Sequence, residues 1–235
     1  MTTFVLVHGA WHGGWCWKFV TQLLQAQGHR VFIPTLTGLA DKSHLLTPDI
    51  NLETHVTDVV NLIKWEELEE VALCGHSYGG MVITGVASQI PDKLSALIYL
   101  DAFLPEHGKS LRDYTPADQS DATAKAAAET SLNTVPPIPA AKFRIRDENQ
   151  AWVDSQCTPQ PFGCMDQPVK RTVVLEDIAK CTYIRAMKHD PSNFIQFQEL
   201  TDADPRWHCR TVDSGHDVMV DDPEELAELL VEAAA

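Results

Sequence analysis

The chain has 235 residues, of which 44% are hydrophobic and 22% charged, and its formal net charge is −15. This composition is typical of a folded globular protein, and the acidity excludes the basic surface expected of a nucleic-acid-binding protein. The first residues lead into an apolar run without a basic leader, and no apolar stretch approaches the ~18 residues of a membrane span. We therefore expect a cytoplasmic protein that binds neither nucleic acid nor membrane.

Short apolar runs and amphipathic runs alternate along the N-terminal half of the chain. Strands are predicted at residues 4–7, 31–34, 71–74 and 96–100. Helices are predicted at residues 19–27, 52–64 and 81–90, the last of them closed by Pro91. Strands that alternate with helices are typical of a parallel sheet covered by helices, so we predict an α/β fold.

The alternation breaks after residue 103 and returns after residue 169. The stretch between them is rich in proline and holds one short helical run at 124–129. Strands at 181–186 and 207–212 and a closing helix at 223–234 follow. We interpret the chain as one domain spanning 1–235, with a cap or lid inserted over the sheet edge at about 104–169.

The motif with the clearest chemistry is Gly75-His76-Ser77-Tyr78-Gly79, which matches the pattern G-x-S-x-G. It follows a predicted strand and precedes a predicted helix, which is the setting of a nucleophile elbow. A serine on so sharp a turn has a strained backbone, and small neighbours let other chain segments pass close by. This motif predicts Ser77 as the nucleophile of a serine hydrolase.

A loop of small residues ends the first strand at His8-Gly9-Ala10. Such a loop can offer a backbone N–H, here that of Ala10, to pair with the N–H of Tyr78 in an oxyanion hole. His8 and His12 lack further ligands at metal spacing, so we expect no metal ion and no cofactor.

A serine nucleophile needs a general base and an acid that orients it. His216 follows the last predicted strand, and the order serine first and histidine last is that of α/β-hydrolases. Asp101 and Asp190 each follow a strand and either could be the acid. Asp101 is slightly favoured, because Asp190 lies in a sequence typical of an exposed turn. Asp217 adjoins the base and is expected to point elsewhere.

The six cysteines contain no C-x-x-C pair, which favours free thiols in a reducing compartment. Only Cys157 and Cys164, close together in the proline-rich stretch, leave disulfide or metal chemistry open.

With these motifs identified, the chain resembles the small α/β-hydrolases that include plant methylesterases, salicylate-binding esterases and hydroxynitrile lyases, with bacterial esterase relatives. The segments that carry the resemblance are residues 4–17, 75–80 and 215–216. The resemblance implies an α/β-hydrolase fold and an oxyanion hole at Ala10 and Tyr78.

The resemblance leaves the acid open. Plant members place it after the strand matching 181–186, where alignment selects Asp190 or His189, whereas bacterial relatives resembling Leu100-Asp101-Ala102-Phe103 use the earlier aspartate. Hydroxynitrile lyases have threonine at the position of Gly9 and lysine at that of Asp217. Because a carboxylate cannot stabilise departing cyanide, ester hydrolysis is favoured.

We therefore predict a serine carboxylesterase that hydrolyses small alkyl or aromatic esters through an acyl-enzyme, with carbamates, amides and xenobiotics as further candidates. A lyase and a non-enzymatic small-molecule receptor are the alternatives. Four aromatic side chains are candidates to line the substrate pocket or simply to pack in the core, namely Trp11, Phe103, Trp152 and Phe162. We expect a monomer or homodimer.

Overall fold

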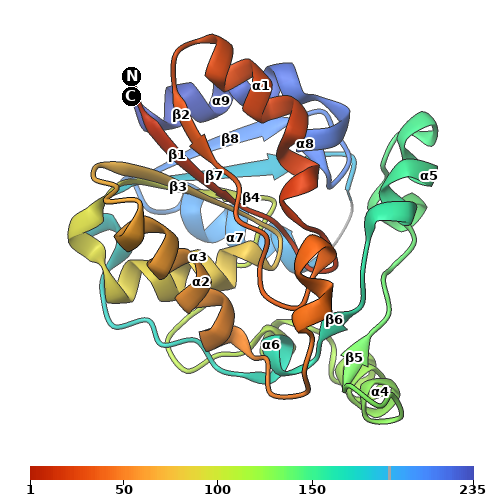
Figure 1. The fold of residues 1–235 in the computed structure, drawn as a ribbon. Coiled ribbons are helices and arrows are strands. Elements are labelled where there is room, and N and C mark those ends of the chain that lie inside the picture. The colour runs from red at the N-terminus through yellow and green to blue at the C-terminus, as the bar shows by residue number, and fades with distance from the viewer. Residues whose placement is uncertain (190–191) are drawn as a thin grey trace.

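The computed structural model describes residues 1–189 and 194–235 in full, and residues 192–193 as helix backbone. Six parallel strands form the central sheet, in the order β2-β1-β3-β4-β7-β8 (Figure 1). Their bounds are β1 Thr3–Val7, β2 Arg30–Phe32, β3 Val71–His76, β4 Leu94–Leu100, β7 Lys180–Ala186 and β8 Trp207–Val212. All six predicted strands are present, so the predicted parallel sheet is confirmed.

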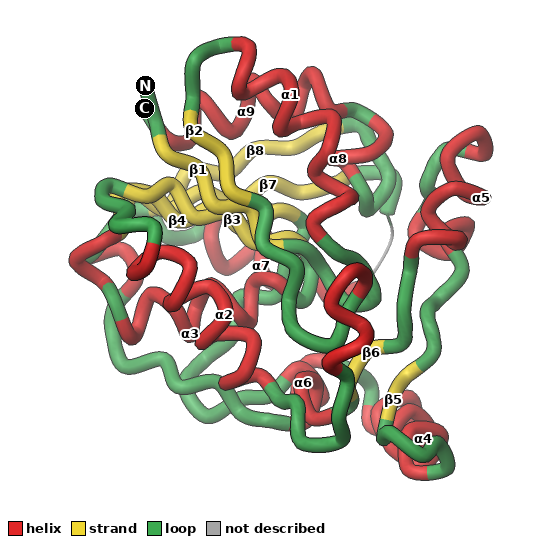
Figure 2. The backbone as a smooth tube through the Cα atoms, in the orientation of Figure 1, coloured by secondary structure: helices red, strands yellow, loops and turns green. Residues whose placement is uncertain are grey.

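Helices cover both faces of this sheet (Figure 2). The helices α1 Lys18–Ala26, α8 Val218–Asp221 and α9 Pro223–Ala234 lie on one face. The helices α2 Leu52–Trp65, α3 Gly79–Gln89 and α7 Ser192–Asp202 lie on the other. No helix among the described residues has the length and apolar composition needed to cross a lipid bilayer.

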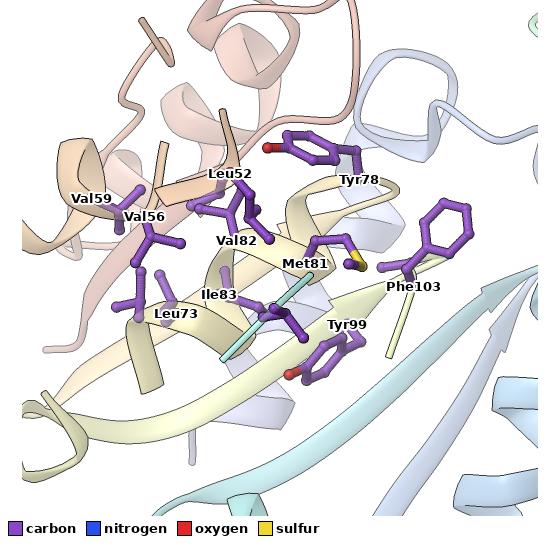
Figure 3. Close-up of a cluster of buried hydrophobic side chains, with 14 of the residues drawn as sticks. Leu52, Val56, Val59, Leu73, Tyr78, Met81, Val82, Ile83, Tyr99 and Phe103 are labelled. Carbon is purple, nitrogen blue, oxygen red and sulfur yellow. The ribbon is translucent and has the colours of Figure 1, made fainter. Parts of the chain in front are cut away.

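The two layers have separate cores because successive side chains of a strand point to opposite faces. Phe4 and Leu6 of β1 belong to the cluster under α1 and α9, whereas Val5 and Val7 belong to the cluster under α2 and α3. Figure 3 shows part of the second cluster, where Val56 and Val82 of two helices pack over the sheet. Strands buried on both faces explain why their sequences are continuously apolar.

Between β4 and β7 the chain leaves the sheet, and we call residues 104–169 the cap segment. It contains α4 Ala117–Ala128, α5 Asp147–Gln156, α6 Gly163–Asp166 and a small antiparallel pair, β5 Thr134–Val135 with β6 Gln160–Pro161. Figure 1 shows α4 and α5 to one side of the sheet. The sequence predicted only the end of α4 and missed α5. All six cysteines are free thiols, so Cys157 and Cys164 form no disulfide.

Candidate active site

Ser77 sits on the turn between β3 and α3 with a positive φ of 53°, a conformation that is strained for a side chain other than glycine. The neighbouring glycines permit this turn sterically. A Cβ on Gly75 would lie 2.6 Å from the carbonyl oxygen of Gly79, and one on Gly80 would lie 2.0 Å from that of Phe103. The structure therefore has the geometry of a nucleophile elbow at the predicted position.

The two amides predicted to bind an oxyanion belong to Ala10 and Tyr78. A Cβ on Gly9 would lie 2.9 Å from Cβ of Ser77, so the loop after β1 packs directly against the serine. Among the residues that the structure describes, neither the N–H of Ala10 nor that of Tyr78 donates a hydrogen bond to a protein acceptor. Both donors are thus left for a ligand oxygen, as an oxyanion hole requires.

Each of these amides belongs to a peptide whose carbonyl accepts a hydrogen bond. Nδ1–H of His8 donates to the carbonyl of Gly9 at 2.8 Å, and the N–H of Phe103 donates to the carbonyl of Ser77 at 3.1 Å. Nε2 of His8 accepts from the N–H of Leu36, and burial lowers the pKa of His8 to about 3, so this ring is neutral. Hydrogen bonds in series polarise the peptides that they join.

His216 lies in the loop after β8, and its Nδ1 is 2.7 Å from Oδ2 of Asp101. The cap segment holds this loop: the N–H of His216 donates to the carbonyl of Phe143 at 2.9 Å. A Cβ on Gly215 would lie only 2.2 Å from the carbonyl oxygen of Arg144, so the close approach requires glycine. Because a carboxylate can only accept hydrogen bonds, Nδ1 of His216 carries the hydrogen of this bond, and Nε2 is free to accept a hydrogen bond or a proton.

Asp101 is fully buried and receives three further donors. Nδ1 of His189 lies 2.8 Å from Oδ2, Nη1 of Arg185 lies 2.5 Å from Oδ1, and the N–H of Ala186 lies 3.3 Å from Oδ1. Burial alone would raise the pKa of Asp101, but the hydrogen bonds from His189 and His216 outweigh it and hold this pKa below its usual value. Asp101 is therefore a stable carboxylate.

Sequence reasoning missed His189 and Arg185 as partners of this carboxylate. The interpretation of the sequence around Lys188 as an exposed turn is wrong for His189, which is only 7% exposed. Its side chain lies beside Asp101 because β4 and β7 are adjacent and in register at Leu100 and Ile184. The alternative acid Asp190 lies outside the described residues.

A further carboxylate–imidazole pair joins His12, in the loop after β1, to Asp217. Nε2 of His12 is 2.8 Å from Oδ2 of Asp217, and Nδ1 of His12 is 2.7 Å from the carbonyl oxygen of Ala10. Both partners are acceptors, so both ring nitrogens carry a hydrogen and His12 is an imidazolium. Burial opposes this charge, but Asp217 raises the pKa of His12 above its usual value. Among the described residues, Asp217 thus pairs with His12 and not with His216, whose Nδ1 donates to Asp101.

A cavity of about 610 Å³ lies above Ser77, and Ser77, His216 and His189 all line it. Its aromatic lining is Trp11, Phe103, Phe143, Phe162 and Phe194. Trp152 is not part of this lining and packs against Trp15, with ring centroids 5.1 Å apart, so its assignment to the pocket is corrected.

In the described part of the chain, no hydrogen bond joins Oγ of Ser77 to Nε2 of His216. Contacts between a nucleophile and its base are often loose in the absence of substrate.

Two sets of side chains place possible metal ligands within 4.8 Å of one another, namely His76, His216 and Asp217, and Asp101, His189 and His216. In the second set both Nδ1 atoms already donate to Asp101, whose other oxygen is paired with the guanidinium of Arg185. A cation there would face this positive charge. The donors in this set suit hydrogen bonding better than metal coordination.

Comparison with known proteins identifies the family. The model of the Alpha/beta hydrolase family matches residues 4–229. The chain belongs to this family. It is 44% identical over 238 residues to a carbendazim hydrolyzing esterase of Nocardioides sp. (strain SG-4G), covering 98% of each chain. It is also 38% identical to Methylesterase 2 of Arabidopsis thaliana over 105 residues, which cover 44% of this chain and 40% of that protein.

A solved structure of an extracellular alpha/beta-hydrolase from a Paenibacillus species superimposes with a TM-score of 0.86 at 24% identity, covering 99% of each chain, and supports the fold alone. Together the comparisons confirm the predicted α/β-hydrolase fold and the resemblance to methylesterases and bacterial esterases. They also confirm the predicted enzyme class, that of the ester-cleaving hydrolases.

Proposed function

We propose that the chain is a serine carboxylesterase in which Ser77 is the nucleophile, His216 the general base and Asp101 the acid that orients it. The observation that carries this proposal is the 2.7 Å hydrogen bond from Nδ1 of His216 to Asp101, in a cavity that also contains Ser77. The strained backbone of Ser77 supports the same role, because strain of this kind is found at functional sites.

In the proposed reaction, Oγ of Ser77 attacks the ester carbonyl while Nε2 of His216 accepts the serine proton. The N–H groups of Ala10 and Tyr78 stabilise the negative oxygen of the tetrahedral intermediate. The carbon–oxygen bond to the alcohol then breaks, and His216 returns the proton to the leaving alkoxide. Water attacks the acyl-enzyme by the same steps and releases the acid. Asp101 keeps the imidazole in the tautomer that can accept from serine.

Fixed hydrogen bonds prepare the proposed oxyanion hole before substrate arrives. His8 donates to the carbonyl of the peptide that supplies the N–H of Ala10, and Phe103 donates to the carbonyl of the peptide that supplies the N–H of Tyr78. Donors that need no reorganisation stabilise developing charge more effectively than mobile water does. This arrangement supports acyl transfer.

The cavity and the relatives indicate the substrate class. A volume of about 610 Å³ lies in the range of sites for small organic molecules, and its aromatic lining favours apolar acyl or alcohol groups. The Nocardioides relative is named for carbendazim hydrolysis, and the Arabidopsis relative is a methylesterase. We propose small alkyl or aromatic esters as substrates, with carbamates, amides and xenobiotic esters as further members of the class. The cap segment is proposed to set this choice.

Cyanohydrin cleavage is disfavoured by Gly9 and by the orientation of Asp217. Asp217 is fully buried against the His12 imidazolium, so it offers the cavity neither a cation nor a proton donor. The receptor alternative predicts binding without turnover, which an activity assay distinguishes.

The binding partners, the cellular compartment and the oligomeric state of the protein remain predictions. The net charge of −15 supports a protein that avoids nucleic acid and anionic membranes. Six free cysteines, four of them buried, support a reducing compartment such as the cytoplasm. A monomer or homodimer is expected.

The decisive test compares the parent protein with Ser77→Ala on p-nitrophenyl esters of increasing acyl length. We expect turnover by the parent that is greatest for short or medium acyl chains and falls at least about 10³-fold in the variant. Turnover that survives in Ser77→Ala would remove the assigned nucleophile. Binding without turnover by the parent would favour the receptor.

A further inference from the structure

A second imidazole lines the cavity beside His216, and the proposed mechanism does not use it. Nδ1 of His189 and Nδ1 of His216 both donate to Oδ2 of Asp101, at 2.8 and 2.7 Å. The two ring centroids are 4.2 Å apart, and both residues line the cavity above Ser77. Two neighbouring imidazoles thus share one carboxylate oxygen and both line the cavity that contains Ser77.

The hydrogen bonds of His189 define what its second nitrogen can do. Because the carboxylate of Asp101 only accepts, Nδ1 of His189 carries a hydrogen. Burial and the neighbouring His216 lower the pKa of His189, so its ring is neutral at neutral pH and Nε2 holds a lone pair. Arg185 donates to the backbone carbonyl of His189 at 2.8 Å and fixes this segment. Among the described residues, the ring of His189 makes its hydrogen bond through Nδ1, and no protein donor bonds to Nε2.

We propose that His189 is a specificity-determining residue whose Nε2 accepts a hydrogen bond from an N–H that the substrate carries beside its scissile carbonyl. The site would then favour carbamate esters that keep an N–H on their nitrogen over N,N-disubstituted carbamates and plain carboxylic esters. An acceptor that faces the cavity and has no protein donor among the described residues can accept a hydrogen bond from a substrate that supplies one. Its position next to the base places it within reach of an acyl group on Ser77. This inference deepens the proposed esterase function and rests on it.

The chemistry of such a substrate needs only the groups already described. Ser77 displaces the alcohol from the carbamate and forms a carbamoyl ester, and the serine proton passes through His216 to the alkoxide. Water then releases a carbamic acid, which loses carbon dioxide and leaves an amine. His189 takes no part in bond breaking and holds the N–H throughout.

The experiment compares three methyl esters that differ only in the group between the phenyl ring and the carbonyl, which is NH, NCH₃ or CH₂: methyl N-phenylcarbamate, methyl N-methyl-N-phenylcarbamate and methyl phenylacetate. The variant is His189→Asn, because the asparagine amide can still donate to Asp101 but places no acceptor at the position of Nε2. His107→Asn changes an exposed histidine of the cap segment and is the matched control. His189→Gln, whose longer amide can reach the position of Nε2, is the rescue variant.

We expect His189→Asn to lower kcat/KM for methyl N-phenylcarbamate about tenfold or more, and for the other two esters by less than about threefold. His189→Gln should restore part of the preference, and His107→Asn should change nothing. An equal fall on all three esters, or no fall on any, would overturn the inference, with thermal unfolding used to recognise a misfolded variant. Turnover of methyl phenylacetate by the parent and its loss in Ser77→Ala test the esterase itself. Failure there would remove both proposals, whereas failure in His189→Asn alone removes only this one.

Discussion

The carboxylate–imidazole pair of Asp101 with His216 and that of Asp217 with His12 differ in what the second nitrogen of the ring contacts. In the pair of Asp101 with His216, Nε2 has no protein partner among the described residues and His216 lines the cavity. In the pair of Asp217 with His12, the second nitrogen donates to the carbonyl of Ala10 and the ring is buried.

This difference separates a base from a structural cation. An imidazole can accept a proton only while one nitrogen keeps its lone pair, which the first pair preserves. Where both nitrogens donate, the ring is already protonated, and it stabilises the loop that carries the proposed oxyanion hole. His12 and His216 therefore have different roles because the second ring nitrogen of His12 has a protein acceptor, the carbonyl of Ala10, and that of His216 has none among the described residues.

Breaking the first pair with Asp101→Asn should have the largest effect. The oxygen of the new amide can still accept from Arg185, so its NH₂ group faces the imidazole and favours the tautomer with hydrogen on Nε2. That tautomer cannot accept the serine proton, and we expect kcat on p-nitrophenyl acetate to fall about 10³- to 10⁴-fold. A fall of less than about tenfold, in a variant that unfolds at the parent temperature, would remove Asp101 from the triad.

Breaking the second pair with Asp217→Asn should change stability more than catalysis. The asparagine NH₂ can donate to a neutral His12, so we expect kcat within about tenfold of the parent. We expect a loss of roughly 1–3 kcal/mol in the free energy of unfolding near pH 5.5, where the ion pair is fully formed.

The pH dependence of this loss follows from the two pKa shifts. The pKa of His12 is raised, so its contribution is complete below the unfolded value near 6.5 and is lost as pH rises through the raised pKa. The pKa of Asp217 is lowered, so its contribution is complete above about 3.9 and is lost as pH falls through the lowered pKa. In urea unfolding, the stability difference between parent and variant should be greatest between about pH 4 and 6.5 and smaller at pH 9. A difference that grows with pH would contradict the ion pair.

Some features of the fold and of the site could be predicted from the sequence, and others could not. The strands and the elbow were predictable because they depend on local features: continuous apolar runs, and a serine between glycines after a strand. The partners of Asp101 were not, because His189 and Arg185 reach it only through the pairing of β4 with β7, whose paired residues, such as Leu100 and Ile184, are far apart in the sequence.

The cap segment was the least predictable region for a related reason. Its helices bury few side chains, Ser120 and Ala127 in α4 and Val153 in α5, so they lack the continuous apolar stripe by which a helix is recognised in a sequence. Trp152 illustrates the limit: an aromatic residue in a predicted cap suggests a pocket wall, yet this side chain packs against Trp15 instead. The amino-acid sequence alone does not distinguish an aromatic side chain in the pocket wall from one that packs against another part of the chain.

The most direct test of the central claim is covalent labelling of Ser77 with a p-nitrophenyl alkylphosphonate. Oγ of the serine should bond to phosphorus as p-nitrophenolate leaves, which adds one phosphonyl group per chain. We predict that peptide mass spectrometry finds this group on Ser77 in the parent and that labelling is at least about 10²-fold slower in His216→Ala. A label on another residue, or equal rates in the parent and His216→Ala, would contradict the assignment of Ser77 and His216 as nucleophile and base.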